Sequence, residues 1–342
     1  MKAVGFHTHL PIDDPQSLVD LDIPTPQPSG RDLLVRVEAI SVNPVDAKQR
    51  GASAKLHSAA DGGLRILGWD AAGIVDAVGP DVTLYRPGDA VYYAGSVTRP
   101  GANSEFHLVD ERIVGTKPAT LDWVQAAALP LTSITAWEGL FERLGIAADG
   151  SDAGRGLLII NGAGGVGSVA IQLAKQLARL HVTASASRSS SADWCRSLGA
   201  DRIIDHKGDM AAQLQDAGGP AIDFVLVCST VDEHLAAVAA LIAPQGKVCA
   251  IAETGAPLPV ALLKQKSVSF TWEYMFTRAM FQTADMIEQQ RLLNEVARLV
   301  DAGVLRTTVG ENLGRIDAAN LRRAHAMLEG GRTIGKIVLS GF

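Results

Sequence analysis

The 342-residue sequence predicts an α/β fold in which a doubly wound parallel sheet follows a smaller β-rich domain. Three observations support this prediction. Over residues 156–178, a continuous apolar run passes through a glycine-rich turn into an amphipathic helical pattern. Strand and helix patterns then alternate as far as residue 272, as in parallel sheets that carry helices on both faces. Before residue 121, short strand patterns are separated by turns rich in Gly and Pro.

The first third of the chain is rich in strand patterns. Turn signals such as Arg86-Pro-Gly-Asp89 and Arg99-Pro-Gly101 interrupt these patterns. Short strands at this spacing predict a small barrel or sandwich. The strand candidates are 2–6, 33–39, 73–78, 90–94 and 106–109.

The middle of the chain predicts the parallel sheet. Asp122 can cap a short helix that ends at Ala128, and Pro130-Leu131 interrupts the chain before a second helix over 133–144. Six strands that alternate with helices complete a doubly wound sheet. The strand candidates are 157–160, 182–186, 202–204, 222–227, 248–251 and 268–272, and the helix candidates are 166–178, 192–198, 209–215 and 231–242.

The tail of the chain predicts two more helices and two short strands. The helices cover 284–302 and 318–328, and the strands lie near 305–309 and at 335–339. Because the tail offers so little β-structure, ending in the strand pattern 335–339, it fits a segment that returns to the first domain better than a third domain. We therefore predict a first domain over 1–127, a sheet domain over 128–272 and a return over 273–342.

The glycine-rich turn at the start of the sheet predicts a dinucleotide site. Gly162, Gly164 and Gly167 form G-x-G-x-x-G between a buried strand and a helix. Such glycines allow a tight turn and a close approach of the backbone to a pyrophosphate, which lies at the positive end of the helix. The alternative is an ordinary glycine-rich turn between a strand and a helix.

The end of the next strand favours NADPH over NADH. Sites that prefer NAD place an Asp or Glu there to bind the ribose 2′-hydroxyl. This chain has Ala186-Ser187-Arg188-Ser189 instead, so no carboxylate repels a 2′-phosphate. The guanidinium of Arg188 and the hydroxyl of Ser187 can bind one. Residues 187–191 can also simply cap the following helix, and both roles are compatible.

Composition and charge exclude several classes of protein. A net charge of −6 and a pI near 5.8 argue against nucleic acid as the main partner. No apolar run is long enough to predict a membrane span, and the N-terminus lacks a signal-peptide pattern. Cys195, Cys228 and Cys249 have neither disulfide nor metal spacing, so we expect a reducing, cytoplasmic location.

Several motifs together resemble one family over essentially the whole chain. They are Asn43-Pro-Val-Asp46, Gly68-Trp-Asp70-Ala-Ala-Gly73, Pro87-Gly-Asp89, Ala127-Ala-Leu-Pro130-Leu-Thr132 and Gly164-Gly-Val-Gly167. The chain resembles the medium-chain dehydrogenase/reductase superfamily, quinone oxidoreductase branch, and the segment 91–101 resembles the zinc-type alcohol dehydrogenase-like subgroup. The resemblance implies a GroES-like β-barrel catalytic domain joined to a Rossmann domain.

The zinc in the subgroup's label conflicts with the residues of this chain. Zinc-containing members place a Cys where this chain has Asn43, and Gly-His-Glu where it has Gly68-Trp69-Asp70. They also carry four closely spaced cysteines, whereas the first domain here has no Cys. Because zinc needs converging thiolate, imidazole or carboxylate ligands, we expect no zinc and no other metal.

The resemblance implies an NADPH-dependent reductase of small molecules. Without a metal, the reaction is easier for acceptors that hold their own electron sink, namely quinones and α,β-unsaturated carbonyls, with the final proton from water. Two alternatives remain open: a zinc-dependent alcohol dehydrogenase, and a non-catalytic NADPH-binding protein. The loops 56–65, 95–103 and 274–282 shape the pocket.

The resemblance also names candidate catalytic residues. Asn43 stands at a zinc-ligand position, where it can donate a hydrogen bond to the nicotinamide or to a substrate oxygen, or merely form the turn before Pro44. Asp46 either braces this loop, the interpretation we favour, or transfers protons. Tyr92 and Tyr93 alternate along a strand, so only one faces the cleft; Tyr93 is either a proton donor to an enolate or a packed barrel tyrosine.

Candidate cofactor contacts follow the same resemblance. Thr132 resembles the threonine near the nicotinamide side, and Gly165 and Val166 supply backbone amides to the pyrophosphate. His206 lies either near the adenosine 2′-phosphate or simply at the surface. Ser229 and Ile251 follow their strands at the edge where such folds bind ligands.

The aromatic segment 268–276 predicts two features. The residues up to Ser269 belong to an edge strand that we expect to pair with its twin in a homodimer. The residues beyond it fit a wall for a flat aromatic acceptor.

Overall fold

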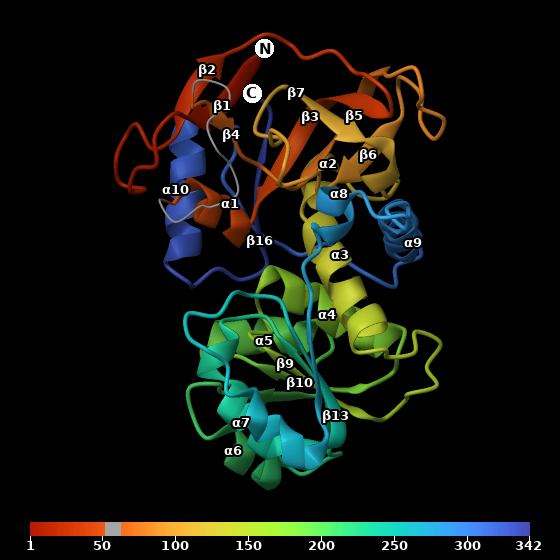
Figure 1. Ribbon diagram of the computed structural model, residues 1–342, viewed down its shortest axis with the longest axis vertical. Helices are drawn as coiled ribbons and strands as arrows, with labels where there is room; N and C mark the ends of the chain where they lie inside the picture. Colours follow the sequence, from red (N-terminus) through yellow and green to blue (C-terminus); the bar gives the residue numbers. More distant parts are fainter. Residues whose placement is uncertain (52–62) are drawn as a thin grey trace. The chain divides into compact units, whose positions relative to one another are not determined.

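The computed structural model describes residues 1–51 and 63–342, and the chain divides into two compact units. The first unit comprises Met1–Leu131 and Phe276–Phe342, and the second is the continuous stretch Thr132–Met275. The first is built mainly of antiparallel strands and the second of parallel strands with helices (Figure 1). The predicted loop 56–65 lies mostly outside the described residues.

The longest strand of the first unit, β3 (Asp32–Val42), is its centre. It pairs antiparallel with β5 (Ala71–Val78), β7 (Phe106–Asp110) and β16 (Lys336–Ser340). Because β3 has neighbours along both edges, most of its side chains are buried. The seven-stranded sheet runs β15-β16-β3-β5-β6-β8 with β7 on β3, and its other strands are β6 (Ala90–Tyr93), β8 (Val114–Thr116) and β15 (Val309–Asn312).

A small second sheet and, among the described residues, five α-helices complete the first unit. The sheet has the order β2-β1-β4. Helix α10 packs against α1, and α9 packs against β8. The bounds are β1 (Lys2–Phe6), β2 (Val19–Asp22), β4 (Arg65–Ile66), α1 (Pro44–Arg50), α2 (Trp123–Ala127), α8 (Thr277–Phe281), α9 (Glu288–Asp301) and α10 (Ala318–Glu329).

The second unit is the predicted doubly wound sheet. Its strand order, β11-β10-β9-β12-β13-β14, is the dinucleotide-binding order, and every neighbouring pair is parallel. The strands are β9 (Gly156–Ile160), β10 (His181–Ser185), β11 (Arg202–Ile204), β12 (Ile222–Val227), β13 (Ile242–Ala250) and β14 (Ser269–Trp272). The helices are α3 (Pro130–Trp137), α4 (Gly165–Gln176), α5 (Ser189–Ser197), α6 (Met210–Ala217) and α7 (Leu235–Leu241).

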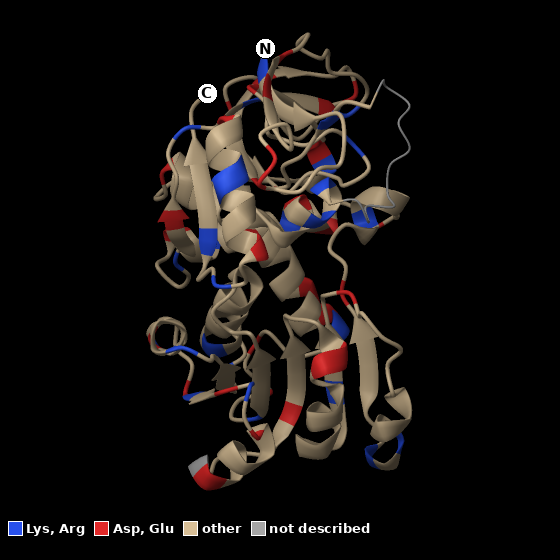
Figure 2. Cartoon of the chain, turned by 90° about the vertical axis from the view of Figure 1, so that its left-hand side faces the viewer, with Lys and Arg blue, Asp and Glu red and all other residues tan. Residues whose placement is uncertain are grey.

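Helical segments cover both faces of this sheet. Val225 and Val227 of β12 pack into one apolar cluster with Leu235 of α7. Leu226, which points the opposite way, lies against Gly139 in a π-helical segment, Glu138–Arg143, that continues α3. The strands are consequently apolar and almost free of charged residues, whereas acidic and basic residues are interspersed on the helices and loops (Figure 2).

Several element boundaries differ from the sequence prediction. The second helix begins at Pro130 rather than Ser133, because proline is tolerated in the first turn of a helix. The helix predicted to end at Ile242 stops at Leu241. The next strand, β13, starts at Ile242, earlier than its predicted start at Val248. The short strands β2, β4 and β8 and the helix α8 were not predicted. No helix among the described residues is long and apolar enough to cross a membrane.

Candidate active site and cofactor site

Asn43 and Asp46 lie at the start of α1, where the chain leaves β3. Asn43 is the N-cap residue, and Pro44 occupies the first turn. The backbone N–H of Asn43 donates to Asp46 Oδ2 at 2.6 Å, and the N–H of Gly68 donates to Asp46 Oδ1 at 3.0 Å. Both oxygens of Asp46 therefore tie the entry of α1 to the turn before β5.

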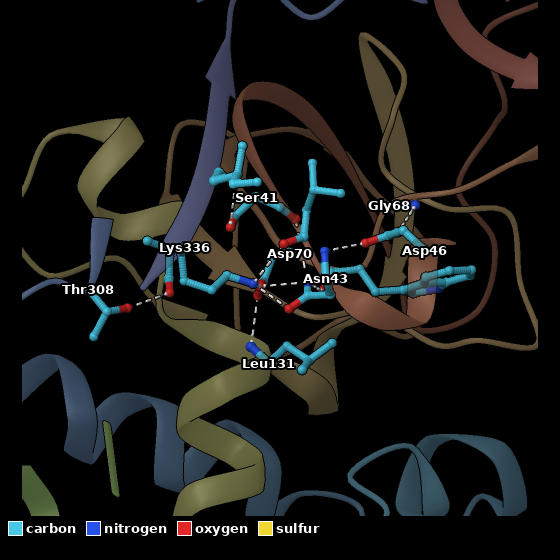
Figure 3. A network of polar contacts seen from close by, with 12 residues as sticks. Ser41, Asn43, Asp46, Gly68, Asp70, Leu131, Thr308 and Lys336 are labelled. Atoms are coloured by element: carbon cyan, nitrogen blue, oxygen red, sulfur yellow. Dashed lines mark hydrogen bonds and ion pairs between the residues drawn. The ribbon is translucent and has the colours of Figure 1, made fainter. Parts of the chain in front are cut away.

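Asp70 gathers three donors from distant parts of the first unit (Figure 3). Its Oδ1 accepts the N–H of Leu131 at 2.7 Å. Its Oδ2 accepts Asn43 Nδ2 and Lys336 Nζ, each at 2.9 Å. Lys336 Nζ also donates to Asn43 Oδ1 and to the carbonyl of Val42. All of these side chains are buried, so the cluster is a dry network of one cation and two carboxyl groups.

Burial sets the protonation of the two carboxyl groups. Burial raises the pKa of Asp46 to about 7, although the N–H groups of Asn43 and Gly68 and the charge of Lys336 oppose the rise. Burial also raises the pKa of Asp70, against the ammonium of Lys336 and the N–H of Leu131. Since Lys336 contacts Asp70 directly, Asp70 is the carboxylate of the ion pair.

The side-chain amide of Asn43 is used within this network. Its Nδ2 donates to the carbonyl of Trp69 at 3.1 Å as well as to Asp70, and its Oδ1 faces Lys336. A hydrogen bond from this amide to a nicotinamide or substrate would have to replace one of these contacts.

Tyr92 and Tyr93 are both buried in the first unit. The Tyr92 hydroxyl donates to the carbonyl of Leu293 at 2.5 Å. His107 Nε2 lies 2.9 Å from the carbonyl of Pro100, so Nε2 carries the proton and Nδ1 accepts the Tyr93 hydroxyl at 3.1 Å. Burial lowers the pKa of His107 to about 4 and raises that of Tyr93, so both groups are neutral near pH 7.

The glycine motif has the steric requirements of a dinucleotide turn. A Cβ on Gly167 would lie 2.6 Å from the carbonyl oxygen of Gly162, and one on Gly162 would lie 2.8 Å from the Cβ of Ala184. A Cβ on Gly164, the N-cap of α4, would meet only Asn161, at 3.4 Å. The first and third glycines therefore allow close packing of strand and helix, and the second leaves the N-terminus of α4 open to a phosphate. These residues fit a dinucleotide.

The residues predicted to select the cofactor lie at the carboxyl ends of β10 and β11. Arg188 is exposed at the N-terminus of α5, and Ser191 caps that helix through the backbone of Arg188. His206 Nδ1 lies 3.0 Å from Ser185 Oγ, which accepts the N–H of Asn161 at 2.9 Å. Burial lowers the pKa of His206.

The other predicted cofactor residues lie as follows. Thr132 is buried within α3. Gly165 and Val166 form the first turn of α4. Ser229 follows β12, and its buried Oγ has no hydrogen-bond partner among the described residues, as a polar atom awaiting a ligand would. Ile251 follows β13.

Lys336 is the main site residue that sequence reasoning missed. In the sequence it is a single Lys at the start of an apolar strand, which is the pattern of an ordinary surface lysine. Its partner Asp70 is 266 positions away. The only local signal in the sequence is a charged residue directly before the apolar run Ile337-Val338-Leu339.

Comparison with known proteins decides the family. A family model described as an alcohol dehydrogenase GroES-like domain matches residues 29–120, and a model described as a zinc-binding dehydrogenase matches residues 198–339. A Staphylococcus epidermidis zinc-type alcohol dehydrogenase-like protein is 38% identical over 99% of both chains. The chain belongs to the medium-chain dehydrogenase/reductase superfamily, in the quinone oxidoreductase branch.

Other members of the superfamily show its range. A Rhizobium etli structure, provisionally described as a zinc-dependent alcohol dehydrogenase, is 54% identical over 100% of this chain and 98% of its own, with a TM-score of 0.94. Escherichia coli quinone oxidoreductase, solved with NADPH, is 25% identical over 99% and 100% of the two chains, with a TM-score of 0.82. An Arabidopsis thaliana NADPH-dependent alkenal/one oxidoreductase is 35% identical over 70% of this chain and 60% of its own. The chain is therefore an oxidoreductase of this superfamily with a GroES-like domain and a Rossmann domain.

Proposed function

We propose that this protein transfers a hydride from NADPH to a quinone or to the β-carbon of an α,β-unsaturated carbonyl, without zinc. The observation that carries the proposal is the state of the two replaced zinc-ligand positions. The side-chain amide of Asn43 is hydrogen-bonded to Asp70 and Lys336. The indole of Trp69 donates to the carbonyl of Ser96 and has no lone pair for a metal ion. NADPH supplies the hydride. A quinone or enone delocalises the negative charge it receives, and water supplies the proton that completes the hydroquinone or the saturated carbonyl.

Two relatives support this acceptor class. The Escherichia coli protein is named a quinone oxidoreductase, and the Arabidopsis protein is named for alkenals and alkenones. In this chain we propose that Asn43 and Asp46 hold the loop against which the nicotinamide and acceptor lie. Holding C4 of the nicotinamide close to the acceptor is then the main contribution of the protein to the rate.

Purified protein freed of metal by a chelator is expected to oxidise NADPH when a quinone or an enone is added. The rate should be the same with and without chelator, and NADH should be a poor substitute. Activity that a chelator abolishes and zinc restores would support an alcohol dehydrogenase. Tight NADPH binding with no turnover on either acceptor would support a binding protein.

We also propose that Ser187, Arg188 and His206 select NADPH, because no carboxylate stands where it would repel a 2′-phosphate. In the same proposal the pyrophosphate lies at the N-terminus of α4, and the nicotinamide side lies near Thr132, Ser229 and Ile251. The NADPH bound to the Escherichia coli relative supports this choice.

Arg188→Glu is expected to weaken NADPH binding about tenfold and to leave NADH binding nearly unchanged, because a charge-assisted contact to the 2′-phosphate is replaced by repulsion. Fluorescence titration with each cofactor measures both affinities. Arg196→Glu, which reverses one charge in the last turn of the same helix, is the control. Equal losses for the two cofactors would contradict the selection.

Tyr93→Phe tests whether water or the phenol of Tyr93 supplies the proton. Removing the hydroxyl leaves Nδ1 of His107 without its donor, so we expect a loss of about 1 kcal/mol in stability. If water supplies the proton, kcat falls less than about tenfold. A larger fall in kcat, with KM and melting temperature unchanged, would assign the proton transfer to the phenol.

We propose a homodimer through the edge strand β14. In the second unit β14 pairs with β13 alone among the described strands. Exposed apolar side chains lie at its end and near it in the sequence: Trp272 in β14 itself, and Val260, Leu262 and Tyr274 before and after it. Sedimentation analysis tests this proposal, since a monomer at micromolar concentration would contradict it.

A further inference from the structure

Two histidines from different loops meet at the carboxyl edge of the parallel sheet. His206 follows β11, and His234 lies between a short 3₁₀ turn, Val231–Glu233, and α7. Their rings pack edge to face, with centroids 5.9 Å apart and planes at 77°. His234 is only 8% exposed, whereas His206 is partly exposed. A ligand from solvent therefore has access to His206, and His234 is the buried partner of that ring.

A chain of hydrogen bonds fixes the His206 ring relative to the glycine turn. Ser185 Oγ accepts the N–H of Asn161 at 2.9 Å and lies 3.0 Å from His206 Nδ1. The Ser185 hydroxyl suits both forms of the ring, because it can donate to Nδ1 of a neutral imidazole or accept the Nδ1–H of an imidazolium. His206 can therefore gain a proton without losing this contact.

The two segments proposed to hold the 2′-phosphate leave the sheet side by side. Ser185 pairs with Ile204 in the parallel register, and the N–H of Ala186 donates to the carbonyl of Ile204 at 2.9 Å. Arg188 stands two residues after Ala186, and His206 two residues after Ile204. An anion bound by Arg188 would thus lie at the same edge of the sheet as the histidine pair.

The turn before His234 contains polar atoms without partners. Ser229 Oγ and Asp232 Oδ1 are buried, and neither has a hydrogen-bond partner among the described residues. Buried polar atoms are normally satisfied, so these two oxygens support a ligand with hydrogen-bond donors at this edge, such as the hydroxyls of a ribose.

The histidine pair is mostly neutral at pH 7 before a ligand binds. Burial lowers the pKa of His206, and His234 lowers it further. Burial also lowers the pKa of His234. Charged groups from both loops act on the pair, the acids raising these pKa values and the lysine lowering that of His206: Asp205, Lys207, Asp232 and Glu233.

A bound phosphate dianion would shift this balance toward the charged form. It attracts an imidazolium and has no such attraction for a neutral ring, so it raises the imidazole pKa. Two imidazolium groups at this spacing would repel each other, so the pair gains no more than a single proton.

We propose that the His206–His234 pair takes up a proton when the 2′-phosphate of NADPH binds, so that the preference for NADPH over NADH grows as the pH falls. The proton comes from the solvent and converts one imidazole into an imidazolium. His206 is the ring that faces the phosphate, and His234 is a positioning residue that packs against this ring and shares its titration. The inference rests on the proposed selection of NADPH and holds whatever the hydride acceptor is.

Calorimetric titration of the full-length protein tests this proposal without an acceptor. NADPH, NADP⁺, NADH and NAD⁺ are each titrated at pH 7.5 in two phosphate-free buffers of different ionisation enthalpy, and the difference in heat gives the protons taken up. At this pH the 2′-phosphate, with a pKa of about 6, is already a dianion before it binds. The variants are His206→Gln and His234→Gln, and His7→Gln, at an exposed histidine of the first unit, is the control.

We expect wild-type protein to take up about half a proton or more with NADPH or NADP⁺, and close to none with NADH or NAD⁺. NADPH should bind about three- to tenfold more tightly at pH 7 than at pH 8, whereas NADH should bind equally at both. His206→Gln should abolish the uptake. His234→Gln should move the pH profile of NADPH affinity to higher pH, because His206 loses a neighbour that lowers its pKa. His7→Gln should match wild-type protein.

Four results would overturn the proposal. Tight NADPH binding without proton uptake would remove it and leave the selection of NADPH standing. Equal uptake with NADH would show that the phosphate is not the cause. Normal uptake by His206→Gln would place the proton on another group. Equal affinities for NADPH and NADH would overturn the proposed selection and this inference together. The wild-type titrations need no variant, so they decide the matter even where a variant fails to fold.

Discussion

Glu273→Gln is expected to raise the melting temperature at pH 9 by on the order of 5 °C and to leave it unchanged at pH 5. Glu273 is buried beside Glu138, and Arg143 Nε lies 2.8 Å from its Oε2. Burial and the neighbouring Glu138 raise the pKa of Glu273 from 4.5 to about 9, against the charge of Arg143. Glu142 adds a smaller repulsion that also raises the pKa of Glu273. Cys249, a further titratable neighbour, stays neutral because burial raises its pKa to about 12.

The direction of this pH dependence of stability follows from proton binding to Glu273. Between pH 4.5 and about 9 the folded protein holds a proton on Glu273 that the unfolded chain has lost, so stability falls as pH rises through this window. Gln is uncharged at every pH and cannot lose a proton there. Thermal melts from pH 5 to pH 9 measure the difference, with Glu288→Gln, which removes an exposed glutamate paired with Arg291 on α9, as the control. The same shift at both pH values would contradict the explanation that the folded protein holds a proton on Glu273.

Gly167→Ala is expected to lower both stability and NADPH affinity. Its Cβ would lie within 2.7 Å of three backbone atoms of Gly162, so α4 must move away from the strand that it follows. Such overpacking costs about 1–3 kcal/mol, and the displaced helix N-terminus should lose about tenfold in NADPH affinity. Thermal melts and fluorescence titration measure the two effects.

Two other glycine variants separate packing from binding. Gly164→Ala has room in the free protein, with its nearest neighbour at 3.4 Å, so it should keep its stability and lose NADPH affinity only. Gly330→Ala, at the C-cap of α10 with φ −67° and no neighbour nearer than 3.4 Å, should change neither. A stable Gly167→Ala that binds NADPH normally would contradict the role of the motif.

The strands of the parallel sheet could be predicted because each one is marked by residues that are close together in the sequence. Each strand is a short apolar run followed by a helical pattern, so Gly156–Ile160 and Ile222–Val227 could be located within a residue or two. The β-rich unit was harder. Val19–Asp22 and Val114–Thr116 are short, and their pairing depends on strands far away in the sequence.

The candidate site divides in the same way. Asn43, Asp46 and the glycine motif belong to compact sequence motifs, so they could be named in advance. The partnerships of Lys336 with Asp70 and of Glu138 with Glu273 join residues far apart in the chain. Nothing within a window of a few residues predicts that a lysine will face a buried carboxylate or that Glu138 will raise the pKa of Glu273.

The pairing of β16 with β3 has a consequence for biosynthesis. All six strands of the second unit lie within one continuous stretch, so its sheet can form while the ribosome is still adding the C-terminal residues. The first unit cannot close until Lys336–Ser340 has emerged, because these residues cover one edge of β3 and carry the counter-ion of Asp70. A translation product that stops before Lys336 would therefore leave one edge of β3 unpaired and would also leave the carboxylate of Asp70 without its counter-ion.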